Sequence, residues 1–187
     1  MNINLIKILG LCFILYLPSN ASAITLQQYI DEPKGRILLM RHELAPGFGD
    51  PANFKLGDCS TQRNSGEEGR DNSVKAGRLI KTSGLAIAGI YSSQWCRCLE
   101  TAELLGIGKI IAHPGLNSFF QDFIPKDKTI AELNKLIVKL KEQKGIYLLV
   151  THQVIITHLT GRTVASGAMV AFDPVTGDST SVELSPN

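Results

Sequence analysis

The sequence predicts an α/β protein, in particular a three-layer α/β/α sandwich around a largely parallel central sheet. Short apolar runs that suit buried strands alternate along the chain with longer stretches of helical periodicity, which is typical of parallel sheets covered by helices on both faces. The 187 residues are enough for one domain with a sizeable core. Because no internal repeat or interdomain linker is visible, we expect a single domain over residues 24–187.

Residues 1–23 are set apart from this domain because they have the pattern of a secretory signal peptide. Lys7 is their only charged residue, residues 8–17 are apolar apart from one glycine, and the segment ends at Ala23 in a small-x-small cleavage pattern. A membrane anchor is the alternative, but this apolar run is shorter than the roughly 20 residues that span a bilayer. We expect cleavage after Ala23, a mature chain that starts at Ile24 without a membrane span, and a periplasmic or secreted location.

The first half of the domain begins with a predicted strand over residues 36–40, an apolar run that stops at an Arg-His pair. Residues 43–69 are rich in glycine and proline and lack periodicity. A loop of this length in a compact domain is usually functional or disordered, and we interpret it as functional. The elements predicted after it are a helix that ends near Gly84, a strand over 86–91, a helix over 96–105 that stops at Gly106, and a strand over 109–112.

The second half contains the clearest helix, predicted over residues 129–143 from apolar residues that repeat at the spacing of one buried stripe. An apolar run over 146–150 predicts a strand that stops at a Thr-His pair. The remaining predicted elements are a helix that extends to Leu159, a turn at Gly161, and two strands around 168–172 and 179–184.

The amino-acid composition and the charge of the chain exclude several classes of protein. Hydrophobic residues make up 44% of the chain and charged residues 19%, so a disordered chain and a small disulfide scaffold both fit poorly. The formal net charge is only +2, and Lys and Arg are interspersed with Asp and Glu. Because a clustered basic face is missing, we expect no nucleic-acid partner.

Three cysteines remain after the predicted cleavage, and export places them where disulfides can form. At most one bridge can form within the chain. Cys96 and Cys98 are two positions apart and would bridge only with strain, whereas Cys59 lies in a loop that can fold back toward them. We favour a Cys59–Cys96 bridge. Zinc binding is the alternative, but the mature chain has no C-x-x-C pair and no H-E-x-x-H motif.

Two predicted core strands end in histidine, at His42 and His152. Ligands of open α/β sheets gather at the carboxyl ends of the strands, so both imidazoles are expected to face one crevice. The strand over 86–91 leads to a Ser-Ser pair and then to Arg97, and Arg41 precedes the first histidine. Because a planar guanidinium can bind phosphate or carboxylate oxygens with two hydrogen bonds, the natural ligand of this cationic pocket is a phosphoryl group.

Three segments share their patterns with one known family. They are residues 39–42 with the strand-terminal Arg-His pair, 91–102 with Ser-Ser-x-x-x-Arg-x-x-x-Thr-Ala, and 150–152 with the second histidine. At these residues the sequence resembles the histidine phosphatase superfamily, which has the phosphoglycerate mutase-like fold. Its size and export signal are similar to those of small periplasmic members, which include lipopolysaccharide core heptose phosphatases.

The resemblance implies a phosphatase reaction that proceeds through a covalent phosphohistidine and needs neither metal nor cofactor. Such an intermediate splits a difficult hydrolysis into two easier steps, and neutral imidazole is nucleophilic near neutral pH. His42 is the implied nucleophile. Arg41, Arg97 and His152 are expected to bind the equatorial oxygens of the transferring phosphoryl group, where fixed positive charge stabilises the transition state.

Two positions depart from the family pattern. Glu43 follows His42 where family members usually carry Gly or Ala, so we expect its carboxylate to enter the pocket and to disfavour an anionic substrate or raise the pKa of His42. Gln153 follows His152, so the acidic partner of the phytase-like branch is absent. The smaller branch takes its acid from a region after the third strand, where Asp122 is the nearest carboxyl, and Glu43 is the competing candidate.

Five further residues have both a functional and a structural interpretation. Trp95 and the Phe119-Phe120 pair either line a substrate wall or belong to the core, and aromatic residues at such spacings are more often core. Arg63 and Arg70 either assist phosphate capture or are solvated arginines near the start of a helix.

The leading hypothesis is an exported phosphomonoesterase that acts on a small phosphorylated substrate, with a sugar phosphate of the cell envelope as one expectation. One alternative is a protein phosphohistidine phosphatase, which the export signal disfavours because such signalling is usually cytosolic. The other alternative is a non-catalytic phospho-ligand-binding member of the same fold, in which Glu43 has damaged the site.

Overall fold

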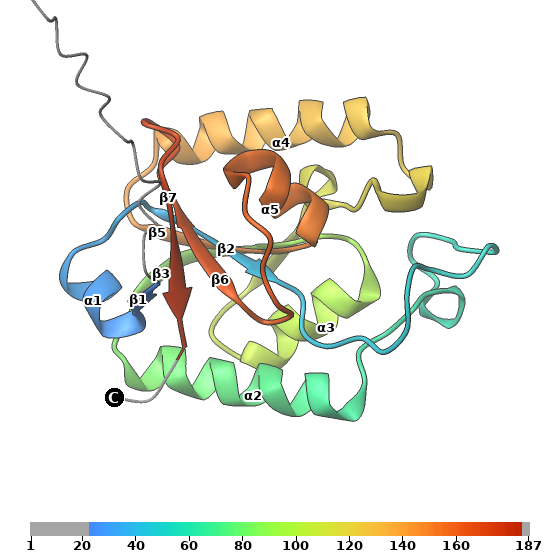
Figure 1. The fold of residues 1–187 in the computed structure, drawn as a ribbon, viewed down its shortest axis with the longest axis horizontal. Helices are drawn as coiled ribbons and strands as arrows, with labels where there is room; N and C mark the ends of the chain where they lie inside the picture. Colours follow the sequence, from blue (N-terminus) through green and yellow to red (C-terminus); the bar gives the residue numbers. More distant parts are fainter. Residues whose placement is uncertain (1–22, 185–187) are drawn as a thin grey trace, which may run out of the picture.

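A computed structural model describes residues 23–184 and shows a seven-stranded sheet between two layers of helices (Figure 1). Most of the predicted signal peptide lies outside these residues, and within them no helix is long and apolar enough to cross a bilayer. The helices are α1 (Leu26–Asp31), α2 (Glu67–Thr82), α3 (Cys96–Leu105), α4 (Lys126–Lys141) and α5 (Gln153–Thr160). The strands are β1 (Ile24–Thr25), β2 (Ile37–Arg41), β3 (Ile87–Ser92), β4 (Ile110–Ala112), β5 (Ile146–Thr151), β6 (Met169–Phe172) and β7 (Ser179–Glu183).

The strand order, β1-β7-β6-β2-β5-β3-β4, confirms the largely parallel sheet that the sequence predicts. β2 and β3 both pair with β5 in parallel, and β4 pairs with β3 in parallel. β6 is the exception, because it runs antiparallel to both β2 and β7. The carboxyl ends of three adjacent strands, β2, β5 and β3, therefore meet at one edge of the sheet.

Both faces of the sheet are buried, as the apolar strand runs indicate. Along β2, Leu38 and Met40 pack in a cluster with side chains of α1, α2 and α3, while Ile37 and Leu39 pack with side chains of α4 and α5. Alternate residues of a strand point to opposite faces, and all four of these side chains are fully buried. Figure 1 shows the resulting layers, with α4 and α5 on one side of the sheet and α2 and α3 on the other.

The predicted helix end at Gly106 and the predicted turn at Gly161 are confirmed. Each glycine is the C-cap of its helix and has left-handed backbone angles, with φ of 61° and 69°. Glycine adopts this conformation without steric cost, which is why it so often ends a helix. Helix α4 begins at Lys126, earlier than the predicted start at residue 129. Its N-cap residue is Pro125.

β1 and α1 are missing from the sequence-based prediction because a two-residue strand and a six-residue helix are too short to show periodicity. A capping box could have identified α1. The hydroxyl of Thr25 accepts a hydrogen bond from the Gln28 amide at 3.2 Å, and the Gln28 side chain accepts one from the Thr25 amide at 2.8 Å.

Candidate active site

The three strand ends bring His42, Ser93 and His152 together. The His42 amide donates a hydrogen bond to the Thr151 carbonyl, and the Ser93 amide donates one to the Val150 carbonyl, each at 2.9 Å, so the ladder continues past the strands. The two imidazole rings lie 5.3 Å apart between centroids. The structure therefore places both histidines in one crevice, as the positions of the strand ends predict.

The His42 ring is held in one orientation and one tautomer. Its Nδ1 lies 2.8 Å from the carbonyl oxygen of Glu43, which can only accept, so Nδ1 carries the proton. Nε2 then carries the lone pair of the ring, which accepts a hydrogen bond from the Arg97 Nε at 3.2 Å. Burial lowers the pKa of His42 to about 3, and the positive charge of Arg97 acts in the same direction. The imidazole is therefore neutral at physiological pH.

His152 is held by a network of polar side chains behind it. The Ser93 hydroxyl donates its only proton to Oδ1 of Asn117 at 3.1 Å and so accepts a hydrogen bond from Nε2–H of His152 at 2.9 Å. Nδ1 of His152 is buried and has no partner among the described residues. Burial, reinforced by the charge of Arg97, holds the pKa of His152 well below its ordinary value.

Arg41 presents a second unpartnered nitrogen. Its Nη1 donates to the Val164 carbonyl at 2.7 Å, but its Nε is buried without a partner among the described residues. A buried polar atom without a partner costs about 1–3 kcal/mol, which a ligand can recover by bonding to it. Arg41 and His152 line the same cavity of about 450 Å³ as His42, Arg63 and Arg97. This charge distribution suits an anion.

Asp50 is the residue that the sequence analysis missed. Its carboxylate accepts two hydrogen bonds from Arg97, at 2.8 and 3.1 Å, and one from the Trp95 indole at 3.1 Å. The Arg97 and Asp50 side chains are only 4% and 5% exposed. Burial raises the pKa of Asp50, but the hydrogen bonds and charge of Arg97 outweigh it, so the pKa lies below its ordinary value. The only sequence signal for Asp50 is its place in the loop interpreted as functional.

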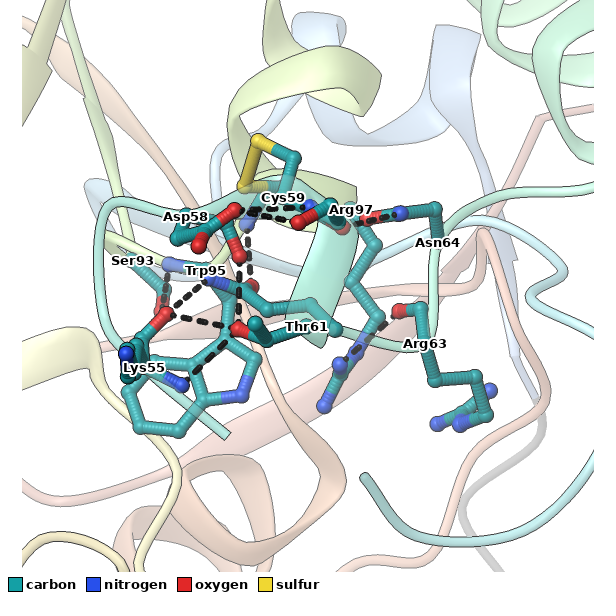
Figure 2. Close-up of a disulfide and its surroundings, with 12 residues drawn as sticks. Lys55, Asp58, Cys59, Thr61, Arg63, Asn64, Ser93, Trp95 and Arg97 are labelled. Atoms are coloured by element: carbon teal, nitrogen blue, oxygen red, sulfur yellow. Dashed lines mark hydrogen bonds between the residues drawn. A yellow bond between two sulfur atoms is a disulfide. The ribbon is translucent and has the colours of Figure 1, made fainter. Parts of the chain in front are cut away.

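The predicted Cys59–Cys96 disulfide is confirmed, and it joins this loop to the first residue of α3. Figure 2 shows the bridge on one side of Arg97 and the Arg63 carbonyl, which accepts from Nη1 of Arg97 at 3.1 Å, on the other. Cys98 is a free, buried cysteine whose sulfur lies 3.4 Å from Nε2 of His152. Burial raises the pKa of Cys98 to about 12, so it remains a thiol.

The expectation that the Glu43 carboxylate enters the pocket is wrong. Successive side chains of an extended segment point to opposite sides, and Glu43 lines a second cavity of about 510 Å³, away from His42. Its carboxylate packs against Gly167, where an added Cβ would lie 2.1 Å from Oε1. The expected increase in the His42 pKa is also wrong, because that pKa is lowered.

Of the remaining candidate residues, some line the cavity that contains His42 and others lie outside it. Asp122 lies in the exposed turn Phe120–Asp122 and does not line the cavity, whereas Phe120 does. Trp95 is fully buried in the core, which confirms the structural interpretation. Arg63 lines the cavity, and exposed Arg70 binds the Ser65 carbonyl outside it.

Comparison with solved structures identifies the class of fold. The protein histidine phosphatase SixA complexed with tungstate has a TM-score of 0.51 and 17% identity, over 78% of this chain and 92% of that one. The alpha-ribazole phosphatase from Shigella flexneri has a TM-score of 0.50 and 15% identity, over 78% and 93%. The mycobacterial glucosyl-3-phosphoglycerate phosphatase has a TM-score of 0.50 and 15% identity, over 73% and 88%.

These likenesses confirm the expected fold class: the chain has the phosphoglycerate mutase-like fold of the histidine phosphatases. At such low identity they establish the fold alone. No protein-family model matches the chain, and a search of curated proteins finds no match either.

We predict that Asp50→Asn lowers the free energy of unfolding by about 3–5 kcal/mol, because it leaves the buried Arg97 guanidinium without its counter-charge. Urea denaturation measures this change. Asp122→Asn is the matched control, since that carboxylate is exposed, and its effect should stay within about 0.5 kcal/mol. Equal effects of the two substitutions would show that the Arg97–Asp50 pair contributes nothing to stability.

We also predict that the His42 ring does not titrate between about pH 5 and 8 in the ligand-free protein, whereas an ordinary histidine titrates near 6.5. Long-range ¹H–¹⁵N spectra, assigned with His42→Ala, should show a protonated Nδ1 and an unprotonated Nε2 throughout. Because the unfolded chain takes up this proton more readily than the folded one, stability should fall as the pH drops below about 6.5. A ring midpoint near 6.5 would contradict the prediction.

Proposed function

We propose that the protein is a phosphomonoesterase in which His42 is the nucleophile. One observation carries this proposal: a neutral imidazole whose Nε2 bears a lone pair shares a cavity with two buried nitrogens that have no partner among the described residues. A phosphoryl group supplies both an electrophilic phosphorus for Nε2 and oxygens for Arg41 and His152. The site therefore suits a ligand that Arg41 and His152 bind and that Nε2 of His42 attacks.

The reaction has two steps. The hydrogen bond from Arg97 Nε to Nε2 of His42 breaks, Nε2 attacks phosphorus, and the bond to the ester oxygen breaks, so that the alcohol leaves with a proton and the phosphoryl group stays on the ring. Water then attacks the phosphohistidine, and inorganic phosphate leaves. Arg41, Arg97 and His152 stabilise the negative charge of the equatorial oxygens in both transition states.

His152 changes its protonation state in this scheme. In the empty site its pKa is held low by burial and by Arg97, so Nδ1 is an acceptor. A bound phosphoryl group brings negative charge beside the ring, which raises that pKa and makes Nδ1 a donor. Protonated His152 is thus a candidate source of the proton for the leaving oxygen, whereas Asp50 is not, because its pKa is lowered and its carboxylate is paired with Arg97. The role of Asp122 as the proton donor remains a prediction. Asp122 lies in the same turn as Phe120.

The structural neighbours support a phosphatase but not a particular substrate. Their names give a protein histidine phosphatase, an alpha-ribazole phosphatase and a glucosyl-3-phosphoglycerate phosphatase, so one fold serves different phosphate compounds. The non-catalytic alternative rested on damage by Glu43. Because the Glu43 carboxylate lies in another cavity, that reason no longer applies.

The proposal is tested by trapping the intermediate. A rapidly quenched reaction with an aryl phosphate should place one phosphate on the peptide that contains His42, in a linkage labile to acid and stable to alkali. His42→Ala should abolish labelling and turnover, while His158→Ala, which removes an exposed histidine on α5, should preserve both. Full turnover of His42→Ala, or phosphate on a serine or cysteine, would refute the mechanism.

We further propose that the protein is exported and that its mature form starts at Ile24. The Cys59–Cys96 disulfide supports this, since such bridges persist in oxidising compartments. Mass spectrometry of the periplasmic fraction should find an N-terminus at Ile24, and Cys12→Ser should leave cleavage unchanged. An intact Met1, or a lipid on Cys12, would contradict the proposal.

A further inference from the structure

We propose that Phe48 and Phe120 form an aromatic subsite for a planar ring in the alcohol part of the substrate, such as the base of a nucleoside monophosphate. The inference rests on the proposed phosphatase function and names the substrate class of that site. Both residues line the same cavity as His42, Arg41 and His152. A phosphate ester anchored by its phosphoryl group would thus extend toward the two rings.

The rings of Phe48 and Phe120 are unusually exposed to solvent for large apolar side chains. Phe48 is 89% exposed and Phe120 is 43% exposed, although large apolar side chains normally avoid water. Their centroids lie 5.3 Å apart with the planes at 83°, an edge-to-face pair that leaves ring surface open to the cavity. A planar ring that covers this surface removes it from water, which favours binding.

The backbone on both sides of Phe48 has a defined conformation and is held by hydrogen bonds. Gly47 and Gly49 flank it with φ of 90° and 68°, angles that favour glycine. The loop is tied to the Phe120 turn because the Gln121 side chain accepts from the Asp50 amide at 2.6 Å and donates to the Asp50 carbonyl at 3.2 Å. An added Cβ at Gly49 would lie 2.8 Å from this amide group. The subsite is therefore held in place before a ligand binds.

Neutral polar side chains are few among the residues that line the cavity. The side-chain amide of Gln153 already donates both its N–H groups, to Thr157 and Arg162, and accepts from Val164. Ser118 and Ser166 supply the remaining neutral side-chain hydroxyls among the lining residues. A site that discriminates for hydroxyl groups needs many placed hydrogen-bond partners. Because the aromatic pair is the larger feature of the lining beyond the phosphoryl pocket, we favour an ester whose alcohol part carries a planar ring over a simple sugar phosphate.

The volume of the cavity is consistent with a substrate larger than a phosphoryl group. At about 450 Å³ it lies in the range of sites that bury a whole small molecule, and its lining combines a few charged groups with apolar side chains such as Leu44 and Val154. The charged groups bind the phosphoryl end, and the aromatic pair remains for the other end.

Two esters with the same primary-alcohol leaving group test this subsite: adenosine 5′-monophosphate, which carries a base, and ribose 5-phosphate, which does not. We expect wild-type protein to have the higher kcat/KM for the nucleotide. Phe48→Ala should lower kcat/KM about tenfold for the nucleotide, the loss typical of one base–aromatic stack, and less than about twofold for ribose 5-phosphate. Phe48→Trp should restore the nucleotide preference.

Val175→Ala is the matched control, since it shortens another exposed apolar residue that does not line the cavity, and it should change neither rate. Equal effects of Phe48→Ala on both esters would overturn the subsite. If wild-type protein hydrolyses neither ester nor an aryl phosphate, the proposed function fails. Calorimetric Kd values for the same two ligands then decide the subsite separately, because only a true subsite gives a nucleotide preference that Phe48→Ala removes.

Discussion

The buried ion pair between Arg97 and Asp50 is the contact on which the rest of the site depends. It fixes Arg97 beside Nε2 of His42, the proposed nucleophile, and holds the loop after β2 against the start of α3. Taking two charges out of water costs several kcal/mol per ion, so such a pair persists only where both groups have nearly full sets of partners. The Trp95 indole and the Arg63 backbone complete these sets. The charge pair and the disulfide therefore both tie the long loop to the start of α3.

Burial and positive charge act together on the two histidines. A carboxylate close to an imidazole normally raises its pKa, but Asp50 is committed to Arg97 and the Glu43 side chain lies in another cavity. The rings of His42 and His152 consequently stay neutral, one with a lone pair for attack and the other ready to take up a proton. In the proposed function a phosphoryl group supplies the negative charge beside these rings, and its binding would be coupled to protonation of His152.

The sequence predicts the site residues that follow directly from the strand pattern, but it predicts few of the contacts made by the long loop. His42, Arg41, Arg97 and His152 could be placed in one crevice because strand ends share an edge, and the helix ends at glycines follow from backbone conformation. The predicted entry of Glu43 failed because adjacency to His42 says nothing about side-chain direction. Asp50 and Phe48 could not be assigned at all, because their roles depend on contacts with residues that are distant in sequence, and a loop without periodicity carries no signal for such contacts.

Asp50 also connects the chemistry of the site to its selectivity. Its side chain holds Arg97 in the phosphoryl pocket, while its backbone is held by Gln121 beside the aromatic pair. Gln121 has a left-handed φ of 69°, which costs a non-glycine residue about 1–3 kcal/mol and is sustained here by those two hydrogen bonds. In the proposed complex, the position of Asp50 thus relates the phosphoryl pocket to the aromatic pair. Under the proposed function, changes in the loop would alter which ester fits while the histidines stay on the strand ends, since binding residues often lie on loops that a rigid scaffold positions.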